Sequence, residues 1–368
     1  MAKAKKSKSI LTEKSYTFLK NYINNPSPTG FETSGQKLWL EYIKPYTDSF
    51  FTDPYGTAVG VINPSAPFKV VIEAHADEIS WFVNYISNDG LIYLKRNGGV
   101  DHQIAPAKRV LIHGKKGPVK AVFGWPAIHT RMANVDAKEP QPKVDNLFLD
   151  CGARSKKEVE ALGIHTGAVA TYEEGYEELS YDYLIGRAFD NRIGGFMIAE
   201  VARLLKENKK KLPFALYVVN AVQEEVGLRG AEMIARRIKP DIAIITDVTH
   251  DTSTPMINKI IEGDCSCGKG PSLAFGPAVH NKLLDVVQNT AEKKKIPVQL
   301  RAVSRSTGTD TDSFAYANEG CPSVLISIPL RYMHTTVEML HKDDIENTIK
   351  LIYETLLVLT SKTKLSYF

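Results

Sequence analysis

The chain has 368 residues, of which 43% are hydrophobic and 24% are charged, and its net charge is +4. This is the composition of a globular protein, and the length suits two domains better than one. The composition excludes a membrane-spanning segment, because no apolar run approaches the length of a bilayer span. It also gives no basic stripe interleaved with aromatic residues, so no nucleic-acid partner is expected.

The termini and cysteines indicate a cytoplasmic protein. The opening MAKAKKSK is predicted to be a loose basic tail, and the SILTEKSYTF after it is too polar for a secretory signal. The four cysteines show neither a disulfide framework nor paired zinc-finger spacing. Cys265 and Cys267 could ligate a metal, but they have no second cysteine pair to complete a site, and no function is assigned to them.

Helices and strands are expected to alternate in the first part of the chain. Helical spacing is found at 11–24 and 31–43, and strand-like apolar runs at 57–62 and 69–76. From about residue 80 the pattern becomes rich in strands. Hairpins are predicted at 81–94 and 109–124, with one short helix at 155–162.

Helices and strands are expected to alternate again after residue 181. Helices are expected at 195–208, 230–238, 281–295, 312–319 and 344–360, and strands at 213–222, 241–248, 298–304 and 323–329. This order predicts an α/β fold with a mostly parallel sheet sandwiched by helices. The catalytic domain would comprise 1–79 and 182–368, interrupted by an inserted small β-rich domain at 80–181.

Polar residues gather where the predicted strands end, which is where ligands bind in open α/β sheets. Each of these residues has an ordinary explanation when it is taken alone, such as a helix cap or an Asx turn. Because all of these residues are expected at one rim of the sheet, they favour a functional site there. The candidates are His75, Asp77 and Glu78 after one strand, Glu224 and Glu225 after the next, then Asp247 and His334, with Asp190 in a turn.

Carboxylates and imidazoles without a thiolate suit divalent metals, zinc first and cobalt or manganese next. Five ligands are too many for one catalytic zinc but suit two metals that share a carboxylate. Three ionised carboxylates and a bridging hydroxide would balance the +4 charge of the metals. The spacing alone does not decide which of Glu224 and Glu225 is the ligand and which is the free general base. Asp77 is placed to orient the imidazole of His75.

Five motifs resemble the cocatalytic metallo-aminopeptidases of the TET type, a group of glutamyl and deblocking aminopeptidases that sometimes carries an endoglucanase label. In chain order they are EAHADEIS, AFDNRIGG, VQEEVGLRGA, TDVTHD and PLRYMHTTVEM, and the resemblance covers essentially the whole chain. It implies that Asp190 bridges two divalent metals, zinc or cobalt, and that Glu224 is the catalytic base. The remaining ligands implied are His75 and Asp247 for one metal, and Glu225 and His334 for the other.

The resemblance also implies that the inserted domain mediates dimerisation and that dimers assemble into a hollow tetrahedral dodecamer. Such a particle would admit only unfolded or short peptides. The chain departs from the family where TGTDTDSF replaces a GGTDAG-like stretch. Asp310 keeps its place there, and Asp312 would either favour a cationic or amino-terminal group of the substrate or cap the following helix. His250 is a rival ligand to Asp247, which the family pattern favours.

The function predicted is a metal-dependent aminopeptidase that removes the N-terminal residue of short peptides. A metal-bridging hydroxide would attack while Glu224 serves as general base. Two alternatives remain. One is a related di-metal amidase or deacylase with the same ligands, and the other is a catalytically inactive metal-binding assembly protein. Glycoside hydrolysis fits less well, since it needs two opposed carboxylates and no metal.

Overall fold

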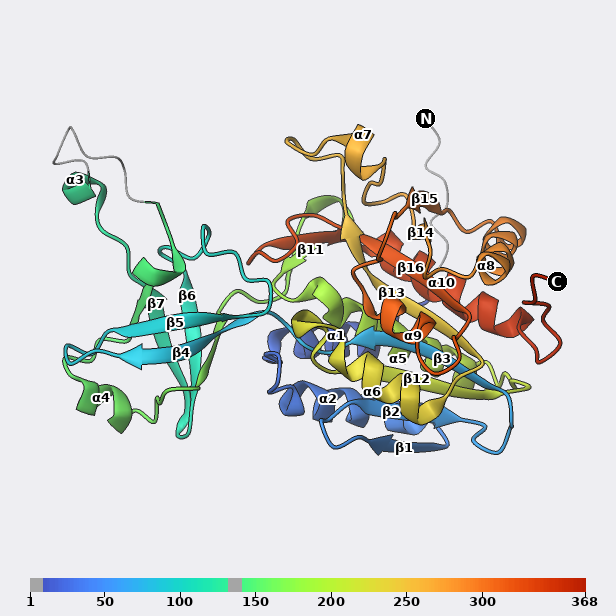
Figure 1. The fold of residues 1–368 in the computed structure, drawn as a ribbon, viewed down its shortest axis with the longest axis horizontal. Coiled ribbons are helices and arrows are strands. Elements are labelled where there is room, and N and C mark those ends of the chain that lie inside the picture. Colours follow the sequence, from blue (N-terminus) through green and yellow to red (C-terminus); the bar gives the residue numbers. More distant parts are fainter. Residues whose placement is uncertain (1–8, 132–140) are drawn as a thin grey trace.

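The computed structural model describes residues 9–131 and 141–368, so the basic tail predicted at 1–8 lies outside the described residues. Figure 1 shows two parts, an α/β layer structure on the right and a smaller β structure on the left. The barrel strands of the smaller part fall between Ser80 and Tyr172. Within the described ranges, no helix is long and apolar enough to cross a membrane.

The large part is built on an eight-stranded sheet that is mixed rather than mostly parallel. Four of its seven strand pairings are parallel, including the three central ones, and three are antiparallel. The edge strands β1 and β2 are antiparallel because a short turn joins them, whereas parallel strands would need a longer crossover connection. The order of the strands is β1 (Ser49–Thr52), β2 (Ala58–Ile62), β12 (Ala215–Ala221), β3 (Lys69–His75), β13 (Ile242–His250), β16 (Ser323–Leu330), β14 (Ser272–Phe275) and β15 (Gln299–Ala302).

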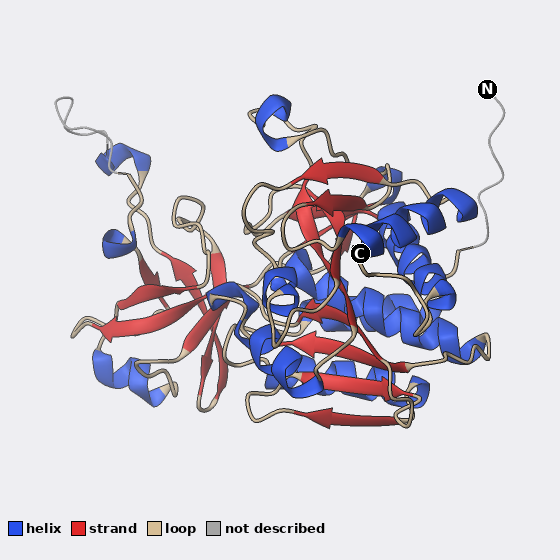
Figure 2. Ribbon diagram, turned by 45° about the vertical axis from the view of Figure 1, so that its right-hand side comes forward, coloured by secondary structure: helices blue, strands red, loops and turns tan. Residues whose placement is uncertain are grey.

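Helices cover both faces of this sheet (Figure 2). On β3, Ala74 faces α5, whereas the preceding residue, Glu73, faces Asp310 of α9, so these two helices lie on opposite faces. The helices on the α5 side are α1 (Glu13–Asn24), α2 (Thr33–Ile43), α5 (Phe189–Glu207) and α10 (Lys342–Val358), with α8 (Asn281–Lys294) packed against α10. On the α9 side, α6 (Arg229–Ile238) packs against α9 (Asp310–Ala315).

Glycines let α5 approach the sheet closely. A Cβ atom at Gly194 would lie 2.8 Å from the Cβ atom of Ala74, and one at Gly195 would lie 2.6 Å from Oδ1 of Asn220. Neither position could hold a larger side chain without moving the helix. The pair therefore fixes the N-terminal end of α5 against the ends of β3 and β12, where the polar residues gather.

The smaller part is a closed six-stranded barrel with its own hydrophobic core around Trp81 and Phe123. Both predicted hairpins are present in it. In barrel order the strands are β4 (Ser80–Ile86), β5 (Ile92–Asn97), β8 (Phe148–Asp150), β7 (Gly117–Phe123), β6 (Arg109–Gly114) and β9 (Val169–Tyr172), and the helices attached to it are α3 (Ile128–Arg131), η2 (Val144–Asn146) and α4 (Lys156–Ala161).

A three-stranded sheet brings two distant segments of the site together. Its strands are β10 (Glu177–Glu178), β11 (Tyr183–Gly186) and β17 (Glu338–His341), and Gly186 pairs with Glu338. Asp190 follows four residues after Gly186, and His334 precedes Glu338 by four residues. The pairing therefore sets the distance between these two side chains. The remaining short helices are η1 (Lys44–Tyr46), η3 (Ser180–Asp182), η4 (Glu224–Val226) and α7 (Lys259–Glu262).

Candidate metal centre

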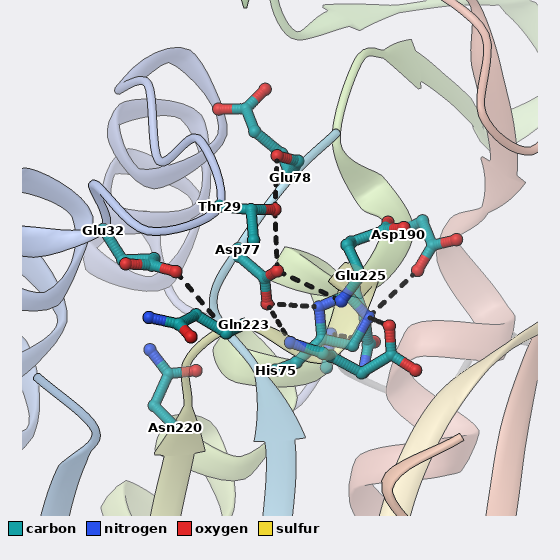
Figure 3. Close-up of polar contacts among 12 residues, drawn as sticks. Thr29, Glu32, His75, Asp77, Glu78, Asp190, Asn220, Gln223 and Glu225 are labelled. Atoms are coloured by element: carbon teal, nitrogen blue, oxygen red, sulfur yellow. Dashed lines mark hydrogen bonds and ion pairs between the residues drawn. The ribbon is translucent and has the colours of Figure 1, made fainter. Parts of the chain in front are cut away.

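The structure brings the strand-end residues into one crevice at the carboxyl ends of the central strands. They come from the ends of β3 and β13, the turn η4 after β12, the first residues of α5 and the loop after β16. Figure 3 shows His75, Asp77, Asp190 and Glu225 turned toward one another. The six residues that gather here are His75, Asp190, Glu224, Glu225, Asp247 and His334.

Asp190 lies between the two histidines. Its Oδ1 atom is 3.2 Å from Nε2 of His75, and its Oδ2 atom is 3.2 Å from Nε2 of His334. One carboxylate oxygen therefore faces each imidazole, which is the arrangement that a carboxylate shared by two metals requires.

The other carboxylates complete two sets of possible ligands around Asp190. Oε1 of Glu225 is 3.4 Å from Nε2 of His334, and Oδ1 of Asp247 is 3.9 Å from Nε2 of His75. His75, Asp190 and Asp247 thus form one group whose ligand atoms lie within 4.8 Å of one another, and Asp190, Glu225 and His334 form a second. Glu224 belongs to neither of these two groups but forms a third with His75 and Glu225, and its Oε2 atom is 3.8 Å from Nε2 of His75.

Both adjacent glutamates reach the crevice because strand β12 ends before them. Gln223 has a left-handed backbone with φ of 58°, and Glu224–Val226 forms a single 3-10 turn. The alternation of a strand no longer applies in such a turn. The turn is held by Asp77, whose Oδ1 atom accepts the backbone N–H of Glu224 at 3.0 Å and whose Oδ2 atom accepts that of Glu225 at 3.2 Å.

Asp77 also contacts the imidazole that it was predicted to orient. Its Oδ1 atom is 3.3 Å from Nδ1 of His75, and its Oδ2 atom accepts the hydroxyl of Thr29 at 2.9 Å. The side chain is fully buried. Nδ1 of His75 is thereby turned away from the crevice and Nε2 toward it.

Glu338 is a residue of the site that the sequence analysis missed. Its Oε2 atom accepts the backbone N–H of Asp190 at 3.1 Å, and its Oε1 atom accepts that of His334 at 2.9 Å. It is buried and therefore fixes the backbone at two candidate ligands at once. The available signal was its position four residues after His334 in PLRYMHTTVEM.

Burial and crowding make this cluster electrostatically unfavourable without cations. Burial, reinforced by Asp310, Asp247 and Glu225, raises the pKa of Glu224 to about 10. Burial also raises the pKa of Asp247 to about 7, with Asp190 and Glu225 adding to the effect. Several carboxylates this close cannot all ionise in a buried site unless positive charge joins them.

The neighbouring carboxylates favour the protonated, positively charged form of the two histidines. Burial alone would lower the pKa of His334, but hydrogen bonds to Asp190 and Glu225 raise it to about 12. Burial would raise the pKa of Asp190, yet its hydrogen bonds with His334 and His75 bring the pKa well below its usual value. Protons on the imidazoles thus occupy the electrostatic role that metal ions would take, and the oxygen and nitrogen donors present fit divalent metals.

A cavity of about 450 Å³ opens beside the cluster. Asp310 and Asp312 are not among the described residues that line it. Asp310 is buried against Glu73, and Asp312 accepts the backbone N–H groups of Thr307 and Gly308, which fixes the loop before α9. The cavity is lined by His75, Gly99, Asp190, Glu224, Glu225, Asp247, Val248, Thr249, His250, Arg301, Thr307, Gly308, Thr309, Met333 and His334.

The remaining sequence candidates lie beside the centre. His250 lines the cavity but belongs to none of the ligand groups found among the described residues. Cys265 and Cys267 are buried outside those groups, and burial raises the pKa of the Cys265 thiol to about 11. Such a thiol stays protonated at neutral pH, and the thiolate is the form that binds metals.

Comparison with known proteins shows which family this chain matches. Residues 56–351 match the family model described as M42 glutamyl aminopeptidase. The lysyl aminopeptidase of Pyrococcus furiosus is 33% identical over 339 residues, which cover 91% of this chain and 95% of that protein.

Solved structures agree over nearly the whole chain. The TET aminopeptidase of Thaumarchaeota archaeon SCGC AB-539-E09 superposes with a TM-score of 0.90 at 30% identity, covering 95% of this chain and 98% of the other. The TET1 peptidase of Pyrococcus horikoshii, described as able to assemble into a tetrahedron or a large octahedral shell, gives 0.83 at 25% identity, covering 94% and 100%.

Proposed function

The chain belongs to the M42 peptidase family and is a metallo-aminopeptidase, and from this premise we propose that it removes the N-terminal residue of short peptides at a two-metal centre. The observation that carries the proposal is the position of Asp190, with one carboxylate oxygen facing each of His75 and His334. Divalent metal ions are implied by the family. The choice of zinc or cobalt follows from the oxygen and nitrogen donors and remains part of the proposal.

The residues that would hold the metals are those of the two ligand groups that share Asp190. His75 and Asp247 would hold one ion, Glu225 and His334 the other, and Asp190 would contribute to both. Paired metals, when bound, polarise the scissile carbonyl and lower the pKa of water. Asp77 would keep His75 oriented, and Glu338 would keep the backbones of Asp190 and His334 in place.

Glu224 is the candidate general base, because both groups that contain Asp190 are complete without it. Its carboxylate lines the same cavity and lies 3.8 Å from His75. In this position Glu224 would take a proton from the attacking water and deliver it to the leaving amine. Bound metals would supply the positive charge that keeps this carboxylate ionised before the reaction.

The oligomeric state is part of the same proposal. The TET1 peptidase of Pyrococcus horikoshii is described as a dodecamer and as able to assemble into a tetrahedron or a large octahedral shell, which supports a tetrahedral dodecamer of this chain. The barrel domain would make the dimer contact. The barrel exposes Tyr85 and Val122, which such a contact would cover. A cytoplasmic location stays a prediction from the sequence.

An activity assay on two substrate classes tests the function. Metal-replete protein would be given aminoacyl amides and N-acylated amino acids, with Glu224→Gln as the blank. Hydrolysis of the free-amine substrates above this blank is expected. Hydrolysis of the acylated compounds alone would indicate a deacylase, and no hydrolysis with two metals bound would indicate a metal-binding assembly protein.

A further inference from the structure

The inserted barrel reaches the candidate metal centre through the turn that follows strand β5. Among the described residues that line the cavity, Gly99 in this turn is the one that comes from the inserted segment 80–181. Its carbonyl oxygen accepts a hydrogen bond from Nδ1 of His334 at 3.1 Å. A carbonyl can only accept, so Nδ1 carries the proton and Nε2 is left free to bind a metal.

The imidazole of His334 has less support from packing than that of His75. The side chain of His75 is 2% exposed, and Asp77, two residues further along the chain, lies against its Nδ1 atom. The side chain of His334 is 32% exposed, and its backbone is left-handed with φ of 61°. The carbonyl of Gly99 thus does for His334 what Asp77 does for His75, but it belongs to the other domain.

Two successive glycines allow the turn to lie against two candidate ligands. A Cβ atom at Gly99 would lie 2.7 Å from Nδ1 of His334, and one at Gly98 would lie 3.2 Å from the Cβ atom of Glu225. A larger side chain at Gly99 would have to displace the imidazole or the turn. The barrel backbone therefore fits closely around Glu225 and His334, which form one of the two candidate ligand pairs.

Contacts on both sides of the turn hold it on the catalytic domain. Asn97, the last residue of β5, is buried, and its Nδ2 atom donates to the carbonyl oxygen of Thr29 at 2.8 Å. Nζ of Lys108 donates to the hydroxyl of Thr336 at 2.7 Å. Thr336 follows His334 by two residues. The barrel is thus attached to the loop that carries this histidine.

The other candidate ligand pair is fixed within the catalytic domain. His75 is oriented by Asp77, and Oδ1 of Asp247 accepts the backbone N–H of Val248 at 2.7 Å. All four residues lie on or beside strands β3 and β13 of the large sheet. A change in the turn of the barrel should therefore leave this pair in place.

We propose that the Gly98–Gly99 turn of the barrel is a positioning element of the metal centre and completes the site for the ion held by Glu225 and His334. The ion held by His75 and Asp247 would depend on the catalytic domain alone. The proposal rests on the two-metal centre of the proposed function. It gives the inserted domain a role in metal binding within its own subunit, in addition to the contact between subunits.

The metal affinity of Gly99→Ala tests the proposal. Gly99 does not have a left-handed backbone, so the added methyl group acts through its clash with the imidazole of His334. Titration against a chromogenic chelator should show one of the two ions bound about 10- to 100-fold more weakly, as when the partner of a ligating histidine is lost. The other ion should keep its wild-type affinity. Full retention of both ions, or equal weakening of both, would overturn the proposal.

Two ligand variants identify the ion that the turn controls. His334→Ala removes the imidazole that Gly99 contacts, so adding Gly99→Ala should leave the affinity for the remaining ion unchanged. His75→Ala leaves this contact intact, so adding Gly99→Ala should still weaken the remaining ion about 10- to 100-fold. The opposite pattern would contradict the assignment of the turn to the Glu225–His334 pair.

A matched glycine separates the turn from the stability of the barrel. A Cβ atom at Gly124 would lie 2.2 Å from Cε2 of Phe148 within the barrel. Gly124→Ala should therefore lower the thermal midpoint while both ions keep their affinity. Selective loss of one ion from this variant would mean that the stability of the barrel, and not the turn, controls the site.

A second variant tests the attachment of the barrel without changing the turn. Lys108→Met removes the hydrogen bond to Thr336 and should weaken the same ion by a smaller factor than Gly99→Ala does. If Gly99→Ala does not fold, unchanged metal binding by Lys108→Met overturns the proposal.

The metal content of the wild type separates this proposal from the proposed function. Binding of about two ions per subunit with aminopeptidase activity, together with unchanged binding in Gly99→Ala, would overturn only the role of the turn. Binding of a single ion by the wild type would overturn the two-metal centre and the role of the turn together.

Discussion

Asp77 accepts the backbone N–H of Glu224 at 3.0 Å, although the two residues are 147 positions apart in the chain. The same carboxylate accepts the N–H of Glu225 and lies against His75. A single buried side chain thus sets the direction of one imidazole and the backbone that presents both glutamates. The geometry of the candidate metal centre therefore depends on Asp77 as well as on the candidate ligands.

Asp77→Asn should weaken metal binding about 10- to 100-fold, which is the usual cost of removing a carboxylate that orients a ligating histidine. The amide keeps one acceptor oxygen, but its NH₂ group must face either an N–H group or the imidazole. Metal affinity would be measured by competition with a chromogenic chelator. Asp285→Asn, an exposed change on α8, serves as the control, and equal affinities in both variants would remove Asp77 from this role.

Glu338→Gln should loosen the two loops that carry Asp190 and His334. Glutamine can accept one of the two backbone N–H groups but not both, and leaving one donor unpaired costs about 1–3 kcal/mol. We expect a lower thermal midpoint together with weaker metal binding. Exposed Glu319→Gln is the matched control. A variant that loses stability but keeps the wild-type metal affinity would show that Glu338 is structural only.

Asp190→Asn should abolish stable loading of the metal pair. A neutral amide is a poor bridge, and Asp190 belongs to both of the groups proposed to hold the metals. The wild type is expected to hold about two ions per subunit. After dialysis, metal analysis of Asp190→Asn should find fewer. Retention of both ions would mean that another group bridges them.

Stability should depend on pH through Asp251. Burial alone would raise its pKa, but hydrogen bonds from the Ser253 hydroxyl, the Arg331 guanidinium and the backbone N–H groups of Ser253 and Cys267 lower it to about 2. Because the folded pKa is below the unfolded one, the stabilisation is present above about pH 4 and is lost as the pH falls toward 2.

Asp251→Asn should therefore cost about 2 kcal/mol at pH 7, and its difference from the wild type should shrink as the pH falls below 4. Thermal unfolding followed from pH 7 to pH 3 measures this difference. Asp285→Asn provides the exposed comparison. A difference that stays constant over this range would show that ionisation of Asp251 does not contribute.

Much of the fold could be predicted because long apolar runs carry a clear period. The core strands β3, β12, β13 and β16 and the helices α1, α5 and α10 agree with the predicted ranges to within a few residues, apart from an earlier start of α5. Strands β1, β14 and β17 were missed. Each has only four residues, too few to show a clear period, and β14 and β17 also pair with strands that are distant in sequence, whereas β1 pairs with β2 across a short turn.

The residues of the candidate site also fall into those that the sequence predicts and those that only the structure reveals. His75, Asp247 and the two glutamates could be found because each lies at or near the carboxyl end of a recognisable strand, and the ends of parallel strands meet. Glu338 acts through the backbone of other residues, so its role becomes visible only when β11 pairs with β17. Arg301 reaches the cavity because β15 joins the sheet beside β14, a pairing that no local pattern in the sequence indicates.

The most direct test of the account is the metal content and kcat of Glu224→Gln measured beside Glu225→Gln. The two changes are chemically identical and affect adjacent residues, so each controls for the other. The account predicts that Glu224→Gln keeps both metals and loses about 10²- to 10⁴-fold in kcat, since the base is removed and every ligand stays. Glu225→Gln should lose metal as well as activity. Loss of metal from Glu224→Gln with full loading of Glu225→Gln would contradict the assignment of ligand and base.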